Sequence, residues 1–317
     1  MTTSRLYPLT FEPIYKERVW GGERLHEALG KELTGIAPVG ESWELVDLSG
    51  DQSRVAAGSR SGATLHDLVQ MDGEALLGPA ALDGERFPLL VKYIDASQTL
   101  SVQVHPDSEA APRLGGRPKS EAWYILDAEP DAVLYLGLEP GVTAASLRAS
   151  LAAGEVEKLV RRIPVRRGDL FPVPPGTVHA IGAGVLLAEV QQPSDTTYRV
   201  YDWGRLGLDG QPRELHVEQA LQSIHFDAEP RGPVREGQVD MGLFRIQVLT
   251  LGDEPVDLRG PGPAVVVGLG GDAALEGAGH DVTCGLGGVV LVPHVVRGEV
   301  AVVARGGRGR VLLVTFP

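Results

Sequence analysis

The stretch "GDLFPVPPGTVHAIG", residues 168–182, joins a glycine, an apolar segment, a Pro-Gly turn and a histidine. Pro175 and Gly176 favour a tight turn, so the segments on either side are expected to pair as a β-hairpin. The first inward residue of the returning strand would then be His179. A histidine on the rim of an ordinary hairpin is the plain alternative, because Pro-Gly hairpins are common. The stretch therefore predicts β structure and marks His179 as a candidate site residue.

Short alternating segments of the same kind dominate the rest of the chain. Alternation with period two is typical of strands that bury one face. The 41 glycines and 23 prolines among 317 residues suit short strands joined by tight turns. We expect an antiparallel sandwich or barrel. The expected strands lie within residues 42–48, 87–95, 99–105, 121–126, 132–138, 168–176, 185–192, 196–203, 244–251, 263–269, 288–296, 299–306 and 310–316.

Helices are expected to be few, and each has a recognisable start or stop signal. Thr64 and Thr143 are candidate N-caps, because their hydroxyls can accept a hydrogen bond from a free backbone N–H of the first turn. Gly154 is expected to break the second helical segment into two short helices. The three predicted helical segments are residues 64–78, 143–163 and 214–226.

The composition changes around residues 227–240, where "DAEPRGPVREGQVD" is polar and rich in proline and glycine. We expect a domain boundary there, with residues 1–235 as a catalytic metal-binding domain that carries short helices, and residues 236–317 as a C-terminal β domain. The motif "RRGDLFPVPPGTVHAI" has a weak echo in "GLGGVVLVPHVVRGEV". In the second copy His294 directly follows the proline, out of register with His179. The C-terminal domain is therefore expected to be a degenerate copy without a metal.

Charge and cysteine content exclude several classes of function. The net charge of −13 argues against binding to nucleic acid or to an anionic membrane, both of which need a positive surface. An anionic substrate would need a local cluster of Lys and Arg to overcome this field. Cys284 is the single cysteine, so neither an intramolecular disulfide nor a thiolate zinc site can form. Apolar runs are strand-sized, and no signal-like segment is present, so a cytoplasmic protein is expected.

Two further segments carry polar residues on faces that a strand would normally bury. In "TLSVQVHPD" the alternation places Ser101, Gln103 and His105 on one face. In "RPKSEAWYIL" it places Lys119 and Glu121 together. A buried carboxylate without a partner costs several kcal/mol or becomes protonated, so a metal or cation partner is expected, and an edge strand in water is the alternative.

Gln103, His105, Glu121 and His179 together offer two imidazoles, a carboxylate and an amide oxygen. This donor set suits Zn²⁺, and also Fe²⁺ or Mn²⁺, with one ion per chain. Lys92 also lies on an alternating segment, where a solvated face is the ordinary interpretation of a lysine.

The order of these motifs resembles a known family. "GDLFPVPPGTVHAIG" is similar to the second motif of the cupin superfamily, with Ala183 where that motif usually has asparagine. "SVQVHPD", "KSEAWYIL", "PPGTVHAIGAG" and "EVQQPSDTTYRVYDWGR" resemble segments of the short, bacterial-type class I mannose-6-phosphate isomerases, which are zinc cupin enzymes. The resemblance covers about residues 7–226 strongly. It implies a mainly β fold of two cupin-type β-sandwich or barrel (jelly-roll) units with a few short helices.

The resemblance also implies site roles and an activity. His105, Glu121 and His179 would bind the metal, with Gln103 as the fourth ligand, and Lys119 and Arg199 would be catalytic. The activity would be aldose–ketose interconversion of mannose 6-phosphate and fructose 6-phosphate through an enediol.

Proton transfer and substrate binding leave alternatives open. Lys119 is the favoured general base, and Glu189 is the second candidate. Arg199 could bind the phosphate or stabilise the enediolate; an ordinary strand arginine paired with an aspartate is the bland alternative. Ser101 could donate a hydrogen bond to the phosphate. The expected substrate-binding residues are Ser101, Lys119, Arg199 and Glu189.

Two rival functions fit part of the same pattern. Another metal-dependent cupin enzyme, such as an oxygenase or an epimerase, could use the two-histidine, one-carboxylate set. A non-catalytic cupin could bind a sugar phosphate without turnover. The expected partner is a hexose 6-phosphate, with no nucleic acid and no membrane, and the expected state is a monomer or homodimer.

Overall fold

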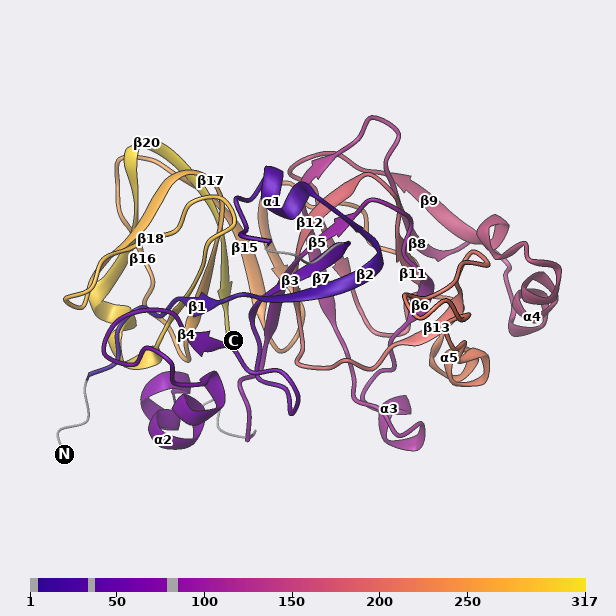
Figure 1. The fold of residues 1–317 in the computed structure, drawn as a ribbon, viewed down its shortest axis with the longest axis horizontal. Coiled ribbons are helices and arrows are strands. Elements are labelled where there is room, and N and C mark those ends of the chain that lie inside the picture. Colours follow the sequence, from indigo (N-terminus) through magenta and orange to yellow (C-terminus); the bar gives the residue numbers. More distant parts are fainter. Residues whose placement is uncertain (1–4, 34–37, 79–84) are drawn as a thin grey trace.

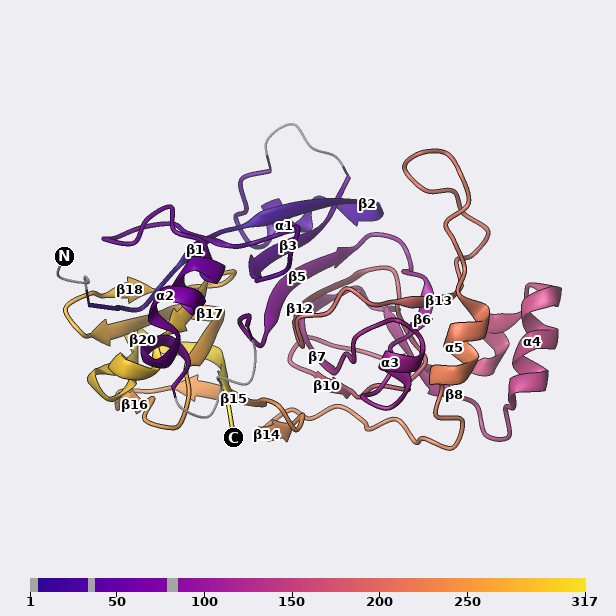
Figure 2. The same ribbon diagram turned by 90° about the horizontal axis from the view of Figure 1, so that it is seen from below.

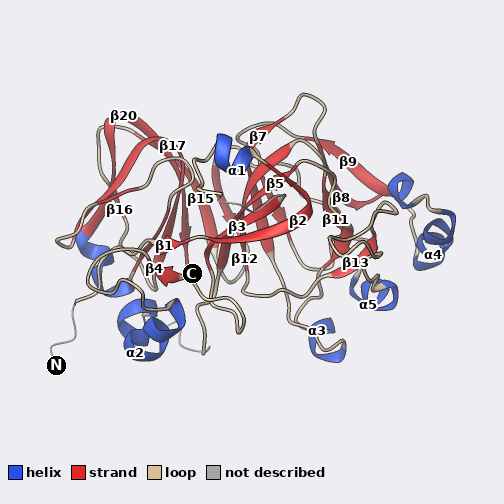
Figure 3. Ribbon diagram, viewed as in Figure 1, coloured by secondary structure: helices blue, strands red, loops and turns tan. Residues whose placement is uncertain are grey.

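The computed structural model describes residues 5–33, 38–78 and 85–317. It is mainly β, as predicted, and its strands form two units that lie side by side (Figure 1). The C-terminal unit is drawn in orange and yellow; the larger unit comes from the rest of the chain, apart from segments near residues 9–12 and 54–78, which lie beside the C-terminal unit. Helices lie around the edges of the strands rather than between them (Figure 3). No helix in this described part of the chain combines the length and apolar character that a membrane span requires.

The larger unit consists of two antiparallel sheets. One has the order β10-β7-β12-β5-β3-β2, and Figure 2 shows it as an arc that runs from β2 to β10. The other has the order β13-β6-β11-β8-β9. The strands of the six-stranded sheet are β2 (Ile14–Gly22), β3 (Val39–Leu45), β5 (Leu90–Ala96), β7 (Glu121–Ala128), β10 (Leu170–Val173) and β12 (Val185–Gln191). Those of the five-stranded sheet are β6 (Val102–Val104), β8 (Val133–Leu138), β9 (Val160–Pro164), β11 (His179–Ile181) and β13 (Tyr198–Tyr201).

These two sheets bury a common apolar core. Ile94 and Ile125 come from the six-stranded sheet, and Leu134, Leu136 and Ile181 come from the five-stranded sheet. The inward faces therefore follow the period-two alternation seen in the sequence. Two short strands, β1 (Phe11–Glu12) and β4 (Arg54–Val55), form a separate antiparallel pair.

The helices begin largely where the sequence predicts. The hydroxyl of Thr64 accepts a hydrogen bond from the N–H of Asp67 at 3.0 Å, and that of Thr143 accepts one from Ser146 at 3.2 Å. Both predicted N-caps are thereby confirmed. The helices are α1 (Arg24–Glu27), α2 (Leu65–Leu77), α3 (Ala110–Arg113), α4 (Ala144–Ala153) and α5 (Val217–Ser223).

The prediction of a second short helix up to residue 163 is wrong beyond Leu159. Gly154 ends α4 in the left-handed conformation, and a short 3₁₀ helix, η2 (Val156–Leu159), follows it. The chain then enters β9, where Val160 pairs with Leu138 and Ile163 pairs with Leu134. Pairing with β8 therefore overrides the helical spacing of the apolar residues.

The C-terminal unit is one seven-stranded sheet with the main order β14-β15-β20-β17-β18. Its two last predicted strands are one continuous strand, β20. His294 lies in a short 3₁₀ helix, η3 (His294–Glu299), and packs against Gly78. The remaining strands and β20 are β14 (Gly237–Asp240), β15 (Arg245–Leu251), β16 (Val256–Asp257), β17 (Ala264–Gly277), β18 (Val282–Thr283), β19 (Val289–Val292) and β20 (Val300–Thr315).

The two units share a hydrophobic core. Val91 and Tyr93 of β5 lie in the same buried cluster as Val265 of β17 and Leu312 of β20. The outer face of the six-stranded sheet is therefore covered by the C-terminal sheet, so β5 is buried on both faces. We propose that the boundary between the two units lies between residues 235 and 236, just before β14.

Candidate metal centre and substrate pocket

His105, Glu121 and His179 lie together although they are far apart in the sequence. Their candidate ligand atoms are all within 4.8 Å of one another, and all three residues are buried. His105 follows the last residue of β6, Glu121 begins β7 and His179 begins β11. The β6–β11 register places Gln103 directly opposite His179, which brings the amide to the same place.

The distances within this cluster are those of groups that face a common point. Glu121 Oε2 lies 3.4 Å from His105 Nε2, and its Oε1 lies 3.3 Å from His179 Nε2. The amide nitrogen of Gln103 lies 3.2 Å from His179 Nε2. Because the nitrogen and oxygen of a side-chain amide are interchanged by a flip, the amide oxygen can occupy this position equally well.

Backbone carbonyls fix both imidazole rings. His105 Nδ1 donates to Thr196 O at 2.8 Å, and His179 Nδ1 donates to Thr177 O at 2.9 Å. Because a carbonyl only accepts, each Nδ1 carries the proton and each Nε2 presents its lone pair to the cluster. Second hydrogen bonds of this kind orient metal-binding histidines in proteins.

The electrostatics of the cluster favour the protonation states that a metal requires. Burial, assisted by the Lys119 ammonium, lowers the pKa of His105 to about 3. Burial alone would raise the pKa of Glu121, but the Lys119 ammonium outweighs it and holds that pKa well below its usual range. Both Glu121 oxygens lack a well-oriented hydrogen bond among the described residues. Neutral imidazoles beside an ionised, unsatisfied carboxylate fit a divalent cation.

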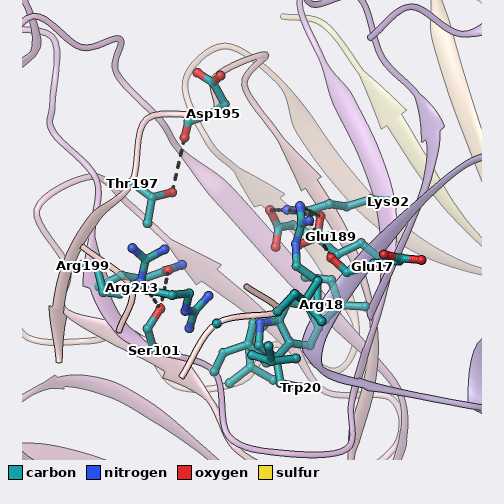
Figure 4. Close-up of a pocket in the computed structure, with 18 of the residues that line it drawn as sticks. Glu17, Arg18, Trp20, Lys92, Ser101, Glu189, Asp195, Thr197, Arg199 and Arg213 are labelled. Atoms are coloured by element: carbon teal, nitrogen blue, oxygen red, sulfur yellow. Dashed lines mark hydrogen bonds and ion pairs between the residues drawn. The ribbon is translucent and has the colours of Figure 1, made fainter. Parts of the chain in front are cut away.

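A cavity of about 620 Å³, most of whose lining residues are drawn in Figure 4, adjoins this cluster through Gln103 and Lys119. It is lined by all the residues that the sequence suggested for substrate contact and by the candidate fourth ligand, namely Ser101, Gln103, Lys119, Glu189 and Arg199. Lys119 Nζ lies 2.8 Å from Glu121 Oε2 and 3.2 Å from His105 Nε2. Lys119 therefore connects the pocket with the cluster beneath it.

Glu189 lies on β12 and is held inside the pocket wall by three neighbours. Its carboxylate oxygens lie 3.2 Å from Lys92 Nζ and 3.7 Å from Lys119 Nζ, and Trp123 Nε1 donates to it at 3.2 Å. Burial and the nearby charge of Glu121 raise the pKa of Glu189, although the two lysines oppose this. Glu189 therefore faces the pocket, as a general base must.

Arg199 lies on β13, opposite Gln103 in the register of β13 and β6. Its Nε donates to Ser101 Oγ at 3.4 Å, and its Nη1 donates to Glu214 O at 2.8 Å. Within the described ranges no carboxylate lies at ion-pair distance from Arg199. The alternative of a surface arginine paired with an aspartate therefore does not describe this side chain.

The sequence argument missed several residues that line the pocket. Lys92, interpreted as a solvated lysine, is buried between Glu189 and Glu41. Glu41 accepts from Arg18 Nε at 3.0 Å and from Trp43 Nε1 at 2.6 Å. Burial would raise the pKa of Glu41, but Lys92 and Arg18 lower it to about 2. The sequence "GESWELVD" places Glu41 on the same strand face as Trp43, a pattern that predicts a buried carboxylate with a partner.

The two-layer β fold and the buried His-Glu-His cluster beside an open pocket define a metal-binding protein of the cupin type. Residues 9–134 match the family model of the phosphomannose isomerase type I catalytic domain. The chain is 42% identical to the mannose-6-phosphate isomerase ManA of Bacillus subtilis (strain 168) over 243 residues, which are 76% of this chain and 74% of that protein. The chain belongs to the type I mannose-6-phosphate isomerase family.

Two further relatives agree with this assignment. The probable mannose-6-phosphate isomerase GmuF of the same organism is 42% identical over 235 residues, 73% of each chain. The crystal structure of the mannose 6-phosphate isomerase from Bacillus subtilis has a TM-score of 0.85 to this fold at 28% identity. That match covers 98% of this chain and 100% of the other, so the likeness includes the C-terminal unit.

Proposed function

We propose that the chain interconverts mannose 6-phosphate and fructose 6-phosphate with one divalent metal ion held by His105, Glu121, His179 and Gln103. One observation carries the proposal. The three titratable ligand groups lie within 4.8 Å of one another beside a pocket whose walls carry Lys119, Glu189 and Arg199. Two imidazoles, a carboxylate and an amide oxygen favour Zn²⁺, with Fe²⁺ or Mn²⁺ as alternatives.

The reaction moves a proton between two neighbouring carbons of the sugar through an enediol. A bound divalent ion supplies Lewis-acid stabilisation for the negative charge that develops on the substrate oxygens. We assign removal and return of the proton to Lys119 as the neutral amine, with its ammonium proton passed to Glu189, whose Oε1 lies 3.7 Å from Nζ at the pocket wall. Glu189 is the second candidate for this role, because its carboxylate lines the pocket and burial raises its pKa.

Substrate binding is assigned to the opposite wall of the pocket. Arg199 and Ser101 are joined by a hydrogen bond there, and the guanidinium carries a charge that no carboxylate within ion-pair distance among the described residues neutralises. This side of the pocket can therefore attract an anionic sugar. Trp20, Ile94 and Leu100 add apolar wall that keeps bulk water from the reacting carbons.

An isomerase assay on mannose, glucose and fructose 6-phosphates, before and after chelation, tests the proposal. We expect turnover of mannose 6-phosphate and fructose 6-phosphate that chelation abolishes and Zn²⁺ restores. Incubation with fructose 6-phosphate in heavy water should place deuterium on the exchanging carbon. Binding without deuterium exchange would contradict isomerisation and indicate a sensor, and oxygen uptake in its place would indicate an oxygenase.

Two finer assignments complete the proposal. All the proposed site residues come from one chain, so a monomer is competent and a homodimer is compatible with the same site. The one cysteine is free and buried, which fits a reducing compartment, and we place the protein in the cytoplasm.

A further inference from the structure

Three arginines surround a single buried aspartate near one end of the pocket, and two of them, Arg199 and Arg213, line the pocket. Asp202 directly follows β13 and is 6% exposed. Its carboxylate accepts from Arg213 Nε at 2.7 Å and from Arg213 Nη2 at 2.5 Å. It also accepts from Arg205 Nη2 at 2.8 Å. Arg199 is the third guanidinium. Burial and the neighbouring charge of Arg213 lower the pKa of Arg199. Arg199 and Arg213 line this end of the pocket together with Asp195 and Asp209, and among the described residues no carboxylate lies at ion-pair distance from Arg199.

The two arginines that grip Asp202 lie on opposite arms of one hairpin. Residues 203–213 turn back on themselves, with Leu206 bridged to Pro212 and Gly207 N–H donating to Gln211 O at 2.7 Å. Arg205 lies on the outgoing arm and Arg213 on the returning arm. The carboxylate of Asp202 therefore closes the base of the hairpin.

The base of the hairpin is also fastened to the chain that leads into β6. Trp203 Nε1 donates to Leu100 O, and Arg205 Nη1 donates to Thr99 O, both at 2.7 Å. Trp203 has a φ of +58°, a conformation that costs free energy for a bulky residue and persists only where its surroundings impose it. The outgoing arm is thus fixed in place, and the ion pair of Arg213 with Asp202 ties the returning arm to it, with Arg213 in the pocket wall. Figure 4 shows Arg213 beside Arg199 and Ser101, across the pocket from Lys92 and Glu189.

Donor groups of both arginines remain available at this wall. Arg213 uses Nε and Nη2 on Asp202, and its Nη1 has no hydrogen-bond partner in the described part of the chain. Arg199 uses Nε on Ser101 and Nη1 on Glu214 O, which leaves its Nη2. Planar guanidinium groups with free N–H donors are well suited to a phosphate group.

Resting on the proposed function, we infer that Arg213 is a phosphate-binding residue that selects phosphorylated sugars, and that Asp202 is the positioning residue that holds it. Ser101 Oγ lies 3.4 Å from Gln103 Oε1 and 3.4 Å from Arg199 Nε, so it stands between the amide of the proposed metal site and the arginine end of the pocket. The reacting carbons then lie at the metal cluster, and the 6-phosphate lies at the arginine end. A protein with a net charge of −13 needs such a local positive site to attract an anion.

Four variants test the inference, with inorganic phosphate and mannose 6-phosphate as probes. Arg213→Gln should weaken phosphate binding and raise KM about 10- to 100-fold, with kcat within about threefold of the wild type. Arg213→Lys should have a phosphate affinity and a KM between those of the wild type and Arg213→Gln, because the lysine ammonium keeps the charge but loses the planar pair of guanidinium donors. Asp202→Asn should raise KM in the same direction. Asp240→Asn removes an exposed aspartate paired with Arg245 on the C-terminal sheet, and as the matched control it should keep wild-type values.

Calorimetric phosphate affinity, KM, kcat and bound metal are measured for each variant. A folded Arg213→Gln protein with wild-type phosphate affinity and KM would overturn the phosphate assignment, as would a loss of kcat at unchanged KM. A folded Asp202→Asn protein with wild-type KM would overturn the positioning role; if that variant does not fold, Arg213→Gln still decides the assignment. If the wild-type protein binds phosphate and Arg213→Gln does not, but the wild type has no isomerase activity, the proposed function is contradicted while the phosphate assignment of Arg213 is supported.

Discussion

His105 and His179 each use one ring nitrogen to hold a backbone carbonyl and leave the other nitrogen for the cluster. The hydrogen bonds from Nδ1 fix the orientation of each ring, so that each Nε2 faces the cluster although the strands that carry the rings are short. Glu121, between them, lacks well-oriented hydrogen-bond partners in the described ranges. Removing any one donor should therefore weaken metal binding, whereas removing Arg199 should not, because its own hydrogen bonds go to Ser101 and Glu214.

His179→Ala should lose both the metal and turnover, whereas Arg199→Ala should keep the metal and lose turnover by about 100-fold or more. Metal content of the purified variants, measured beside the isomerase rate, distinguishes the two outcomes. Near-normal metal in a folded His179→Ala protein would remove His179 from the ligand set.

Glu41 should make stability depend on pH at the acid end. Its pKa in the folded protein is lowered from 4.5 to about 2 by Lys92 and Arg18, against the effect of burial. The ionised carboxylate therefore stabilises the fold above pH 4.5, by about 3 kcal/mol, and this stabilisation is lost as the pH falls towards 2.

Denaturant unfolding of wild type and Glu41→Gln at several pH values measures this contribution. The wild type should be more stable at pH 7, and the difference should shrink as the pH falls below 4.5. Glu12→Gln, which changes an exposed glutamate on β1, should show little difference at any pH. A difference between wild type and Glu41→Gln that stays constant down to pH 2.5 would contradict the assignment.

Sequence reasoning singled out polar residues that the structure buries close together, and it misinterpreted Lys92 as a solvated residue. Glu121 and His179 stand out because alternation predicts an inward position for them. Lys92 also follows the period-two alternation, but the polar face of an alternating strand is normally exposed to solvent, so the sequence predicts an exposed lysine. Here β5 is covered on both faces, by the inner core and by the C-terminal sheet. Pairing with distant Glu41 and Glu189 cannot be inferred from local pattern.

At the scale of elements, local signals determined helix starts better than helix ends. Thr64 and Thr143 cap α2 and α4 because a side-chain oxygen next to free N–H groups acts within three residues. The segment after Gly154 depends instead on a partner strand more than 20 residues away. Register with β8 makes residues 160–164 a strand, which no local propensity indicates.

Thr64→Ala should lower the free energy of unfolding by about 1 kcal/mol, because the N–H of Asp67 loses its acceptor. KM should not change, since α2 contributes no residue to the pocket lining. Thr64→Ser keeps the hydroxyl and is the matched control, with stability close to wild type. Equal destabilisation of the serine and alanine variants in denaturant melts would show that the cap hydrogen bond is not the cause.

At the scale of the whole molecule, the two β units are joined by a continuous hydrophobic core rather than by a linker alone. Leu9 near the start of the chain exchanges backbone hydrogen bonds with Leu291 of β19 at 2.8 and 2.9 Å. Tyr93 of β5 and Leu312 of β20 belong to one buried cluster. The composition change at residues 227–240 predicted where the chain passes between the units, but it could not predict that they share a core.

Cys284 offers a direct measure of this coupling. It is buried, and burial raises the pKa of its thiol to about 12. The native protein should therefore react with a thiol reagent at pH 8 at least about 100 times more slowly than the unfolded chain. If the two units unfold together, labelling and loss of activity should share one denaturant midpoint. Labelling of Cys284 while activity persists would contradict cooperative unfolding.

The shared core has a consequence for how the family can diversify. The outer face of the six-stranded sheet, including Val91 and Tyr93, is shaped to the side chains of β17 and β20. A chimaera that grafts the C-terminal unit of one relative onto the catalytic unit of another must therefore match both faces. Substitutions in the C-terminal unit are then constrained by the six-stranded sheet that it covers, so the two units are expected to change together rather than as interchangeable modules.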